Sequence, residues 1–255
     1  MHKKKRILLK IGTNTLTKDS EFISRGKIED IGRQIAALKE DYEFIIVSSG
    51  AIAAARQFVK LEHNGEEITV KQALASIGQP HLMRIFQENF RELGLFTSQC
   101  LLSYSDFEKA QSQENIKSTI NVLVANNYIP IINENDTVAT DEIQFGDNDK
   151  LAALTASLLA ADILIIATNT DGIYTKASLG NARPETITTV SDLKSLKKEI
   201  GNSKSSQGTG GMASKIEAAT IAKASGVETW ITNGLKDNFI LDAIHHKSTF
   251  TTIKA

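Results

Sequence analysis

The chain has 255 residues, of which 41% are hydrophobic and 23% are charged, proportions that are typical of a globular domain and exclude a fibrous or disordered chain. The 29 basic and 30 acidic residues give a formal net charge of -1, so no general positive field is present to bind nucleic acid. Only three apolar residues separate the basic start of the chain from Lys10, too few for a signal peptide or a membrane span, and we expect a cytoplasmic protein with small-molecule partners.

Short apolar runs alternate along the chain with stretches of helical spacing. Each run is too short for a helix and is bounded by polar or glycine residues, which predicts a buried strand. Apolar side chains recur at helical spacing over residues 28–38 and 151–159. The alternation predicts an α/β fold with a mainly parallel sheet, helices on both faces and ligands beyond the carboxyl ends of the strands. The predicted strands cover residues 7–9, 44–47, 129–132, 163–167 and 229–231.

No internal repeat and no linker rich in Pro, Gly or Ser divides the chain, so we expect one domain over residues 1–255. A seam near Ala160 would separate an N-terminal lobe, about residues 1–160, from a C-terminal lobe, about residues 161–255. Two segments depart from the alternation. Residues 139–145 predict a short hairpin or an irregular excursion, and the polar residues 199–211 predict a mobile loop.

The first motif lies at the end of the first predicted strand, where Gly12 follows Lys10 by two positions. A glycine there lets backbone N–H groups approach an anion, and the lysine adds a positive charge. A solvated lysine followed by an ordinary turn is the commoner explanation of such residues, since turn signals are common. This motif alone therefore does not define a site.

The second motif, Ser48, Ser49 and Gly50, joins the second predicted strand to an alanine-rich helix. Hydroxyl and N–H groups converge at such a helix start, where they could bind an anionic or carboxylate ligand. Serine is also a good N-cap and glycine a good turn residue, so both interpretations stay open.

A dense acidic segment is the strongest functional signal in the sequence. The residues Asn-Glu-Asn-Asp at 133–136 follow a predicted strand directly, and Asp147, Asn148 and Asp149 precede a predicted helix. Carboxylates this close together repel one another, so we expect a cation among them: a substrate ammonium, a lysine or Mg²⁺. Asp149 is also well placed to cap the helix. Acid clusters after strands lie where α/β proteins bind ligands, which favours a functional site.

A glycine-dense loop, residues 208–215, leads into a helix and ends on Lys215. Glycines give backbone N–H groups access to phosphate oxygens, and a lysine in the first turns could reach the same phosphates. A flexible surface loop with a solvated lysine is the alternative. The G-x-G-x-x-A spacing is not a dinucleotide fingerprint, because a long polar loop precedes it, and no Walker-type phosphate loop occurs in the chain.

The fifth motif follows another predicted strand and contains Thr168, Asn169 and Asp171, with Tyr174 just beyond. Polar side chains at this point could line a ribose or adenine pocket. A strand that ends in a plain Asp-Gly turn explains the residues almost as well.

In this order, the strings SSGAI, INENDTVAT, GDND and GTGGM resemble the amino acid kinase family, and within it the branch that phosphorylates free glutamate. The resemblance covers nearly the whole chain. It implies a three-layer αβα sandwich around a mainly parallel sheet, ATP and Mg²⁺ as cofactors, and phosphorylation of the γ-carboxylate of L-glutamate in the first step of proline biosynthesis. It also implies a homo-oligomer with proline as a possible feedback inhibitor.

The resemblance also implies roles for individual residues. Lys10 and Lys215 would bind the transferred phosphoryl group, and Asp149 would hold both lysines. No protein ligand of Mg²⁺ is implied. The substrate-binding residues would be Ser49, Asn133, Asp136, Asp147 and Asn148. The nucleotide-binding residues would be Gly12, Thr168, Asn169, Thr209, Gly210, Gly211, Met212, Ala213, Ser214 and Lys215.

Three features depart from the commonest family pattern. Many members carry an additional C-terminal domain of RNA-binding type (PUA), whereas this chain stops at Ala255, as expected for a short form. Asn169 stands where aspartate is commoner, and Ser214 stands where threonine is commoner. Neither change removes a catalytic charge.

Two alternatives to a glutamate-phosphorylating enzyme stay open. One is a sister kinase that acts on aspartate, N-acetylglutamate, carbamate or UMP, and the other is a non-catalytic nucleotide-binding regulator. The strings INENDTVAT and GDND favour free glutamate. The presence of Lys10, Asp149 and Lys215 together favours catalysis.

Overall fold

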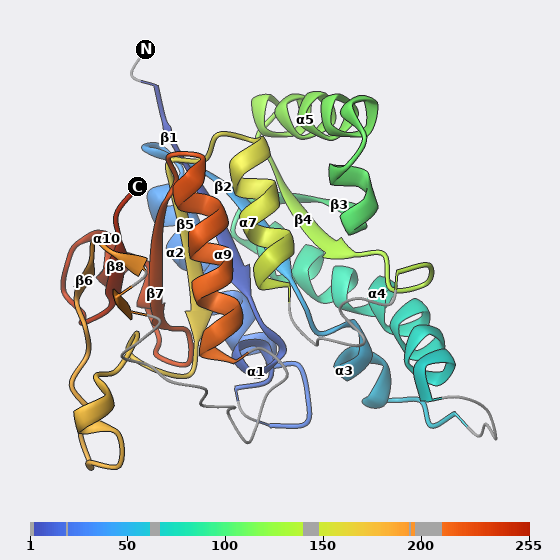
Figure 1. Ribbon diagram of the computed structural model, residues 1–255. Coiled ribbons are helices and arrows are strands. Elements are labelled where there is room, and N and C mark those ends of the chain that lie inside the picture. The colour runs from blue at the N-terminus through green and yellow to red at the C-terminus, as the bar shows by residue number, and fades with distance from the viewer. Residues whose placement is uncertain (1–2, 19, 62–66, 140–147, 194, 197–210) are drawn as a thin grey trace.

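The computed structural model describes residues 3–18, 20–61, 67–139, 148–193, 195–196 and 211–255, which are built around one sheet (Figure 1). Its strands are β1 (Lys5–Ile11), β2 (Tyr42–Ser48), β3 (Phe96–Leu102), β4 (Tyr128–Glu134), β5 (Ile163–Thr168), β6 (Thr189–Val190), β7 (Glu228–Asn233) and β8 (Thr251–Ile253). Within the described residues they form an eight-stranded sheet in the order β3-β4-β2-β1-β5-β7-β8-β6. Every neighbouring pair is parallel except β7 with β8.

All five predicted strands are confirmed, and they are the five contiguous inner strands from β4 to β7. The sequence pattern does not predict β3, because this edge strand is largely exposed and its residues, FTSQCLL, mix polar with apolar side chains. Strands β6 and β8 contain two and three residues, too few to give a periodic signal.

Helices cover both faces of the sheet, as the sequence predicts (Figure 1). Buried side chains of α2, α4 and α10 pack against one face, and those of α5, α7 and α9 pack against the other. This is the three-layer αβα sandwich that the family resemblance implies. The helices are α1 (Thr13–Thr17), α2 (Arg25–Leu38), α3 (Ala51–Arg56), α4 (Glu67–Glu92), α5 (Ala110–Ala125), α7 (Asp149–Leu158), α9 (Met212–Ala224) and α10 (Phe239–Ile244), with short 3-10 turns η1 (Tyr104–Phe107) and η2 (Lys176–Ser178).

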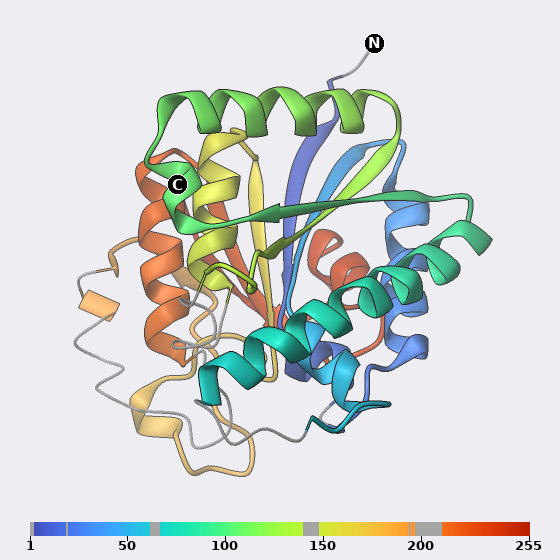
Figure 2. The same cartoon turned by 90° about the vertical axis from the view of Figure 1, so that its right-hand side faces the viewer.

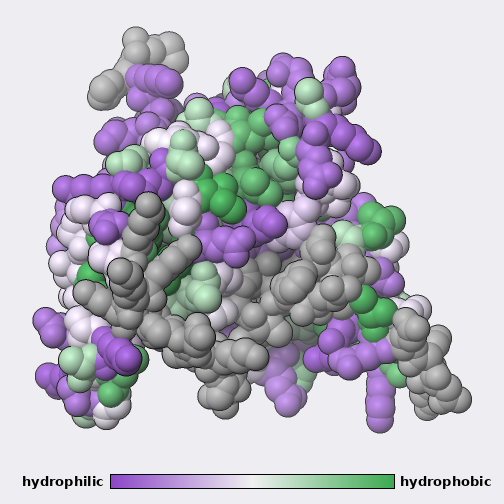
Figure 3. All heavy atoms as spheres, in the orientation of Figure 1, coloured by the Kyte–Doolittle hydropathy of each residue, from purple (hydrophilic) through white to green (hydrophobic). Residues whose placement is uncertain are grey.

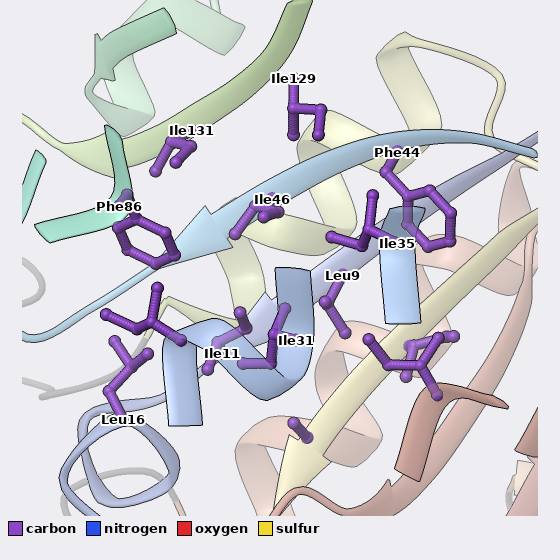
Figure 4. Close-up of a cluster of buried hydrophobic side chains, with 14 of the residues drawn as sticks. Leu9, Ile11, Leu16, Ile31, Ile35, Phe44, Ile46, Phe86, Ile129 and Ile131 are labelled. Atoms are coloured by element: carbon purple, nitrogen blue, oxygen red, sulfur yellow. The ribbon is translucent and has the colours of Figure 1, made fainter. Parts of the chain in front are cut away.

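The larger apolar core lies between the sheet and the α2 and α4 side. Branched side chains from the inner strands, such as Leu9, Ile46 and Ile131, meet Ile35 of α2 and Phe86 of α4 there (Figure 4). Figure 2 shows α4 crossing the β3 side of the molecule, while α5 runs along the end where β1 begins. The opposite end of the sheet, where α1 and the first turn of α9 are found (Figure 1), holds the site described below.

The pleat of β1 decides which way Lys10 points. Successive side chains of a strand alternate between the two faces of the sheet. Leu9 and Ile11 belong to the core under α2 and α4, whereas Leu8 belongs to the core under α7 and α9. Lys10 has the same parity as Leu8, so its ammonium faces the α7 and α9 layer at the carboxyl end of the strand.

A buried polar cluster connects α2 to the segment between β7 and α10. Lys27, only 1% exposed, forms an ion pair with Asp30 at 3.1 Å and donates to the Lys236 carbonyl at 2.6 Å. Gln34 accepts from the backbone N–H of Ile240 at 2.7 Å. Burial lowers the pKa of Lys27, while Asp30 opposes that shift. The cluster ties residues of the N-terminal half of the chain to residues of the C-terminal half.

The outer surface matches this layered arrangement. Hydrophilic residues dominate the rim of the face shown in Figure 3, as expected where the outer helices meet water. In the described part of the chain, none of the helices combines the length and the apolar character that a membrane span requires.

Helix α4 approaches α3 closely enough for their backbones to touch. A Cβ atom on Gly78 would lie 1.8 Å from the Ala51 carbonyl oxygen and 2.8 Å from the Ala55 nitrogen. Only glycine fits at this position, because the obstructing atoms belong to the backbone and cannot move aside alone. The contact fixes the position of α4 relative to the start of α3.

We predict that Gly78→Ala lowers the free energy of unfolding by about 3 kcal/mol, because the added methyl group overpacks a backbone contact. The matched control is Gly26→Ala in α2, where a Cβ would find none of the described atoms within 4 Å. The control should be at least as stable as the parent, since alanine is the better helix former. Urea unfolding of all three proteins measures the difference. Equal stability of the Gly78→Ala variant and the parent would show that the helices separate at no cost.

Candidate active site

Asp149 joins two lysines that are far apart in the sequence. Lys10 Nζ lies 2.5 Å from Asp149 Oδ1, and Lys215 Nζ lies 3.0 Å from Asp149 Oδ2. Lys10, Asp149 and Lys215 are 3%, 0% and 6% exposed. The structure thus brings together the two lysines and the aspartate that the family resemblance groups at one site. The acidic segment predicts a nearby cation, either a substrate ammonium, a lysine or Mg²⁺, and Asp149 forms its ion pairs with lysines.

Each of these side chains is delivered by the end of a secondary-structure element. Lys10 is the penultimate residue of β1, a central strand of the sheet. Asp149 is the first residue of α7, whose N-cap is Asn148, so the expectation that Asp149 caps this helix is wrong by one position. Lys215 lies in the first turns of α9, after the N-cap Gly211. The positive ends of two helix dipoles therefore meet at the end of β1.

The protonation of Asp149 follows from its neighbours. Full burial alone would raise the pKa of this carboxyl group, but attraction to Lys10 and Lys215, and hydrogen bonds from both, hold it well below its usual range. Asp149 is also the first residue of a helix, where a negative charge is favoured. The carboxylate therefore remains ionised at neutral pH and can brace both ammonium groups.

Glycines flank the two lysines at the end of β1 and at the start of α9. A Cβ atom on Gly12 would lie 3.5 Å from Lys10 Nζ, and one on Gly211 would meet no atom of the described residues within 4 Å. Ser214 Oγ donates to Asp149 Oδ2 at 3.0 Å, which places the start of α9 against the same carboxylate. Glycines on both sides leave room for an anion to approach the lysines, and phosphate oxygens suit such a setting.

A buried network of amides lies next to this cluster. Asn148 Nδ2 donates to Asn133 Oδ1 at 2.8 Å, to the Ser48 carbonyl at 3.0 Å and to Ser49 Oγ at 3.2 Å. Asn133 Nδ2 donates in turn to Gln79 Oε1 at 2.9 Å. Ser49 does not cap α3, whose N-cap is Gly50. The structure thus brings Ser49, Asn133 and Asn148 together at the carboxyl ends of β2 and β4.

Asp136 lies just beyond β4, two residues after the strand ends. It is 8% exposed, and burial raises its pKa to about 6. A buried carboxyl group with a raised pKa favours a cationic partner, because a nearby positive charge would offset the cost of burying the ionised form.

The fifth motif continues from the end of β5. Thr168 is partly buried and Asn169 is exposed, with Thr168 Oγ1 lying 3.5 Å from Asn169 Oδ1. Asp171 pairs with Lys236 at 2.6 Å and accepts from Asn233 Nδ2 at 2.9 Å. Burial works against its ionisation, but Lys236 and Asn233 hold the pKa of Asp171 below its usual range.

Several sequence expectations concern residues outside the described part of the chain. They are the substrate-binding assignment of Asp147, the nucleotide-binding assignments of Thr209 and Gly210, and the conformations expected for 140–145 and 199–210. The described nucleotide-binding candidates Gly211, Met212, Ala213 and Ser214 form the N-cap and first turn of α9.

Two polar residues of this region carry no assignment from the sequence. Gln79 reaches Asn133 from the middle of α4, and Lys236 reaches Asp171 from the segment after β7. A signal for the first existed in the string Gly-Gln-Pro inside a helix, since an interior glycine usually marks a close packing contact. The segment around Lys236 is polar and turn-like, so it carries no comparable signal.

Comparison with known proteins finds relatives that match most of this chain. The sequence model of the amino acid kinase family matches residues 5–233. A glutamate 5-kinase from Neisseria gonorrhoeae is 39% identical over 251 residues, which cover 96% of this chain and 84% of that protein. A glutamate 5-kinase from Thermoanaerobacter pseudethanolicus is 43% identical over 237 residues, or 92% of this chain and 64% of that protein. The chain thus spans part of the length of each relative.

Solved structures share the fold. Carbamate kinase from Giardia lamblia bound to AMP-PNP superposes with a TM-score of 0.70 at 15% identity, covering 100% of this chain and 99% of that one. UMP kinase from Ureaplasma parvum superposes with a TM-score of 0.65 at 18% identity, covering 99% of this chain and 100% of that one. At such identities the likeness concerns the fold alone. The family match over residues 5–233 and the relative at 39% identity show that the chain belongs to the amino acid kinase family.

Proposed function

We propose that this protein is a cytoplasmic glutamate 5-kinase, which transfers the γ-phosphoryl group of ATP to the side-chain carboxylate of L-glutamate in the first step of proline biosynthesis. The observation that carries the proposal is the pair of buried ammonium groups, Lys10 and Lys215, held on the two oxygens of Asp149. The relatives named glutamate 5-kinase, at 39% and 43% identity, favour glutamate as the acceptor.

Phosphoryl transfer to a carboxylate brings two anions together. The site must therefore neutralise charge on the migrating group while it holds the two reacting oxygens in line. Lys10 and Lys215 supply two positive charges, and Asp149 fixes where both of them stand. The cluster is almost fully buried, and charges act more strongly on a bound phosphate there than they would in water.

The balance of the reaction requires no general base. The γ-carboxylate of glutamate is already ionised at neutral pH, so one of its oxygens can attack phosphorus directly. As that O–P bond forms, the bond between the γ-phosphorus and the bridging oxygen breaks, and ADP leaves with the electron pair. The products are L-glutamyl 5-phosphate and ADP, and no proton is transferred.

Mg²⁺ would enter together with the phosphates of ATP, as part of the substrate. Within the described ranges, no group of three or more His, Cys, Asp or Glu side chains could hold a metal ion. Both oxygens of Asp149 are engaged by lysines. The described residues therefore do not fit a metal site built by the protein alone, and no step above depends on one.

The amide network and Asp136 would form the amino-acid pocket. Asp136 would face the substrate ammonium, because its buried carboxyl group favours a cation. Ser49, Asn133 and Asn148, which are linked by hydrogen bonds, would orient the rest of the molecule. We include Asp147 in this pocket on the family resemblance alone.

ATP would lie between Gly12 and the start of α9, where glycines would let backbone N–H groups approach the phosphates. Thr209 and Gly210 would complete that loop, and Thr168 and Asn169 would contact the nucleoside beyond β5. From the family resemblance we also propose a homo-oligomer that is inhibited by proline.

The proposal is tested by ADP release with a panel of possible acceptors: glutamate, aspartate, N-acetylglutamate, carbamate and UMP. Hydroxylamine in the same assay traps an acyl phosphate as a hydroxamate. We expect ADP release and hydroxamate formation with glutamate well above those with the other acceptors. ADP release with another acceptor alone would assign the chain to a sister kinase, and no release with any acceptor would favour a non-catalytic protein.

We predict that Lys215→Met lowers turnover by roughly a hundredfold or more, the scale for losing one preorganised charge at the transition state. Lys223→Met, in the last turn of the same helix, is the matched control and should retain turnover. Circular dichroism checks that both variants are folded. An unchanged rate in a folded Lys215→Met variant would remove this lysine from the mechanism.

We predict that the Michaelis constant for glutamate rises as the pH falls below about 6, since protonation of Asp136 removes the charge that would hold the ammonium. Asp136→Asn should raise this constant already at pH 8 and abolish its dependence on pH near 6, while the constant for ATP changes little. Asp41→Asn, just before β2 at the opposite end of the sheet, serves as the control. An equal effect of Asp136→Asn on both substrates would place Asp136 outside the amino-acid pocket.

A further inference from the structure

Gln79 is a buried polar residue that α4 delivers to the amide network. Its side chain accepts from Asn133 Nδ2 at 2.9 Å, and the residue is only 7% exposed. It lies one position after Gly78, at the point where α4 touches the backbone of α3. The side chain is therefore held by a rigid helix and by a specific hydrogen bond, and its placement is not incidental.

Backbone groups at two points fix the orientation of every amide in the network. The Ser48 carbonyl can only accept, so the atom of Asn148 that faces it must be Nδ2. The backbone N–H of Glu134 can only donate, so the atom of Asn133 that receives it at 3.0 Å must be Oδ1. Asn133 then has only Nδ2 left for Gln79, which must turn Oε1 toward it. Gln79 Nε2 is therefore a donor whose direction is determined by the fold.

Two buried polar atoms of this network have no hydrogen-bond partner among the described residues: Gln79 Nε2, a donor, and Asn148 Oδ1, an acceptor. A buried donor or acceptor without a partner costs free energy, so such atoms indicate a ligand that completes them. A free amino acid carries a carboxylate that accepts and an ammonium that donates at the same carbon atom. A donor and an acceptor in one network match that pair.

We propose that Gln79 donates from Nε2 to the α-carboxylate of the substrate and thereby selects a free amino acid. The inference rests on the proposed function, because it presumes that glutamate occupies this pocket. The γ-carboxylate must meet Lys10 and Lys215 at Asp149, which directly follows Asn148 in the chain. The hydrogen-bonded side chains run from Asn148 to Asn133 and then to Gln79. Gln79 is therefore at the end of the network away from Asp149, where the α-carboxylate of the substrate would lie.

The test exchanges the donor for an acceptor and compares two substrates. Gln79→Glu has the same shape and retains an oxygen for Asn133, but it replaces Nε2 with an oxygen that repels a carboxylate. The comparison substrate is the α-amide of glutamate, whose γ-carboxylate is free and whose amide N–H groups can donate to that new oxygen. ADP release gives kcat/KM for each substrate. The control is Gln87→Glu, the same change on the exposed side of α4.

We expect the ratio of kcat/KM for glutamate to that for its α-amide to fall by roughly a hundredfold in Gln79→Glu, since a charge-assisted hydrogen bond becomes a repulsion. The ratio should be unchanged in Gln87→Glu. A structural role alone would lower kcat/KM for both substrates alike and leave their ratio unchanged. A ratio in Gln79→Glu within about threefold of the parent would overturn the inference.

A second variant keeps the test decisive if Gln79→Glu does not fold. Gln79→Met has a similar length without any donor, and the ratio should then fall by roughly tenfold. A parent protein that phosphorylates glutamate, together with an unchanged ratio in the variant, would overturn this inference alone. A parent without glutamate-dependent ADP release would overturn the proposed function, and this inference with it.

Discussion

Two ammonium groups on Asp149 are the interaction on which the rest of the site depends. Removing one partner of a buried ion pair costs about 3–5 kcal/mol, because the other charge is left without compensation. Lys10 and Lys215 are buried and both pair with Asp149. If either side chain moved away, the carboxylate would lose part of its compensating charge and the protein would be destabilised. The arrangement keeps two positive charges side by side before any phosphate binds, which is the preorganisation that phosphoryl transfer requires.

The sheet explains how residues so far apart in the chain reach this point. Central strand β1 presents Lys10 toward the α7 and α9 layer by the parity of its pleat, and both helices start at the same end of the sheet. The amide network then extends from Asn148 across the ends of β2 and β4 to Gln79. In this account the charged end would bind the reacting groups, and the neutral amide end would recognise the amino acid.

The sequence predicts most of the frame and the charged part of the site, and the reasons are specific. Inner strands are continuous apolar runs, so β4, β2, β1, β5 and β7 are all predictable, whereas exposed β3 and the very short β6 and β8 are not. Asp149 and Lys215 occur in recognisable strings at the starts of predicted helices. The string Gly-Gln-Pro indicates only that α4 packs closely at this point, and the contact of Gln79 with Asn133 becomes visible only when α4 lies against α3.

A double-mutant cycle of turnover measures whether Lys10 and Lys215 act as one unit on a single phosphoryl group. Lys10→Met, Lys215→Met and the double variant are compared with the parent under saturating ATP and glutamate. We expect the double variant to be little slower than the slower single variant, because losing either charge already disables the unit. Losses that multiply, as for two independent groups, would contradict it.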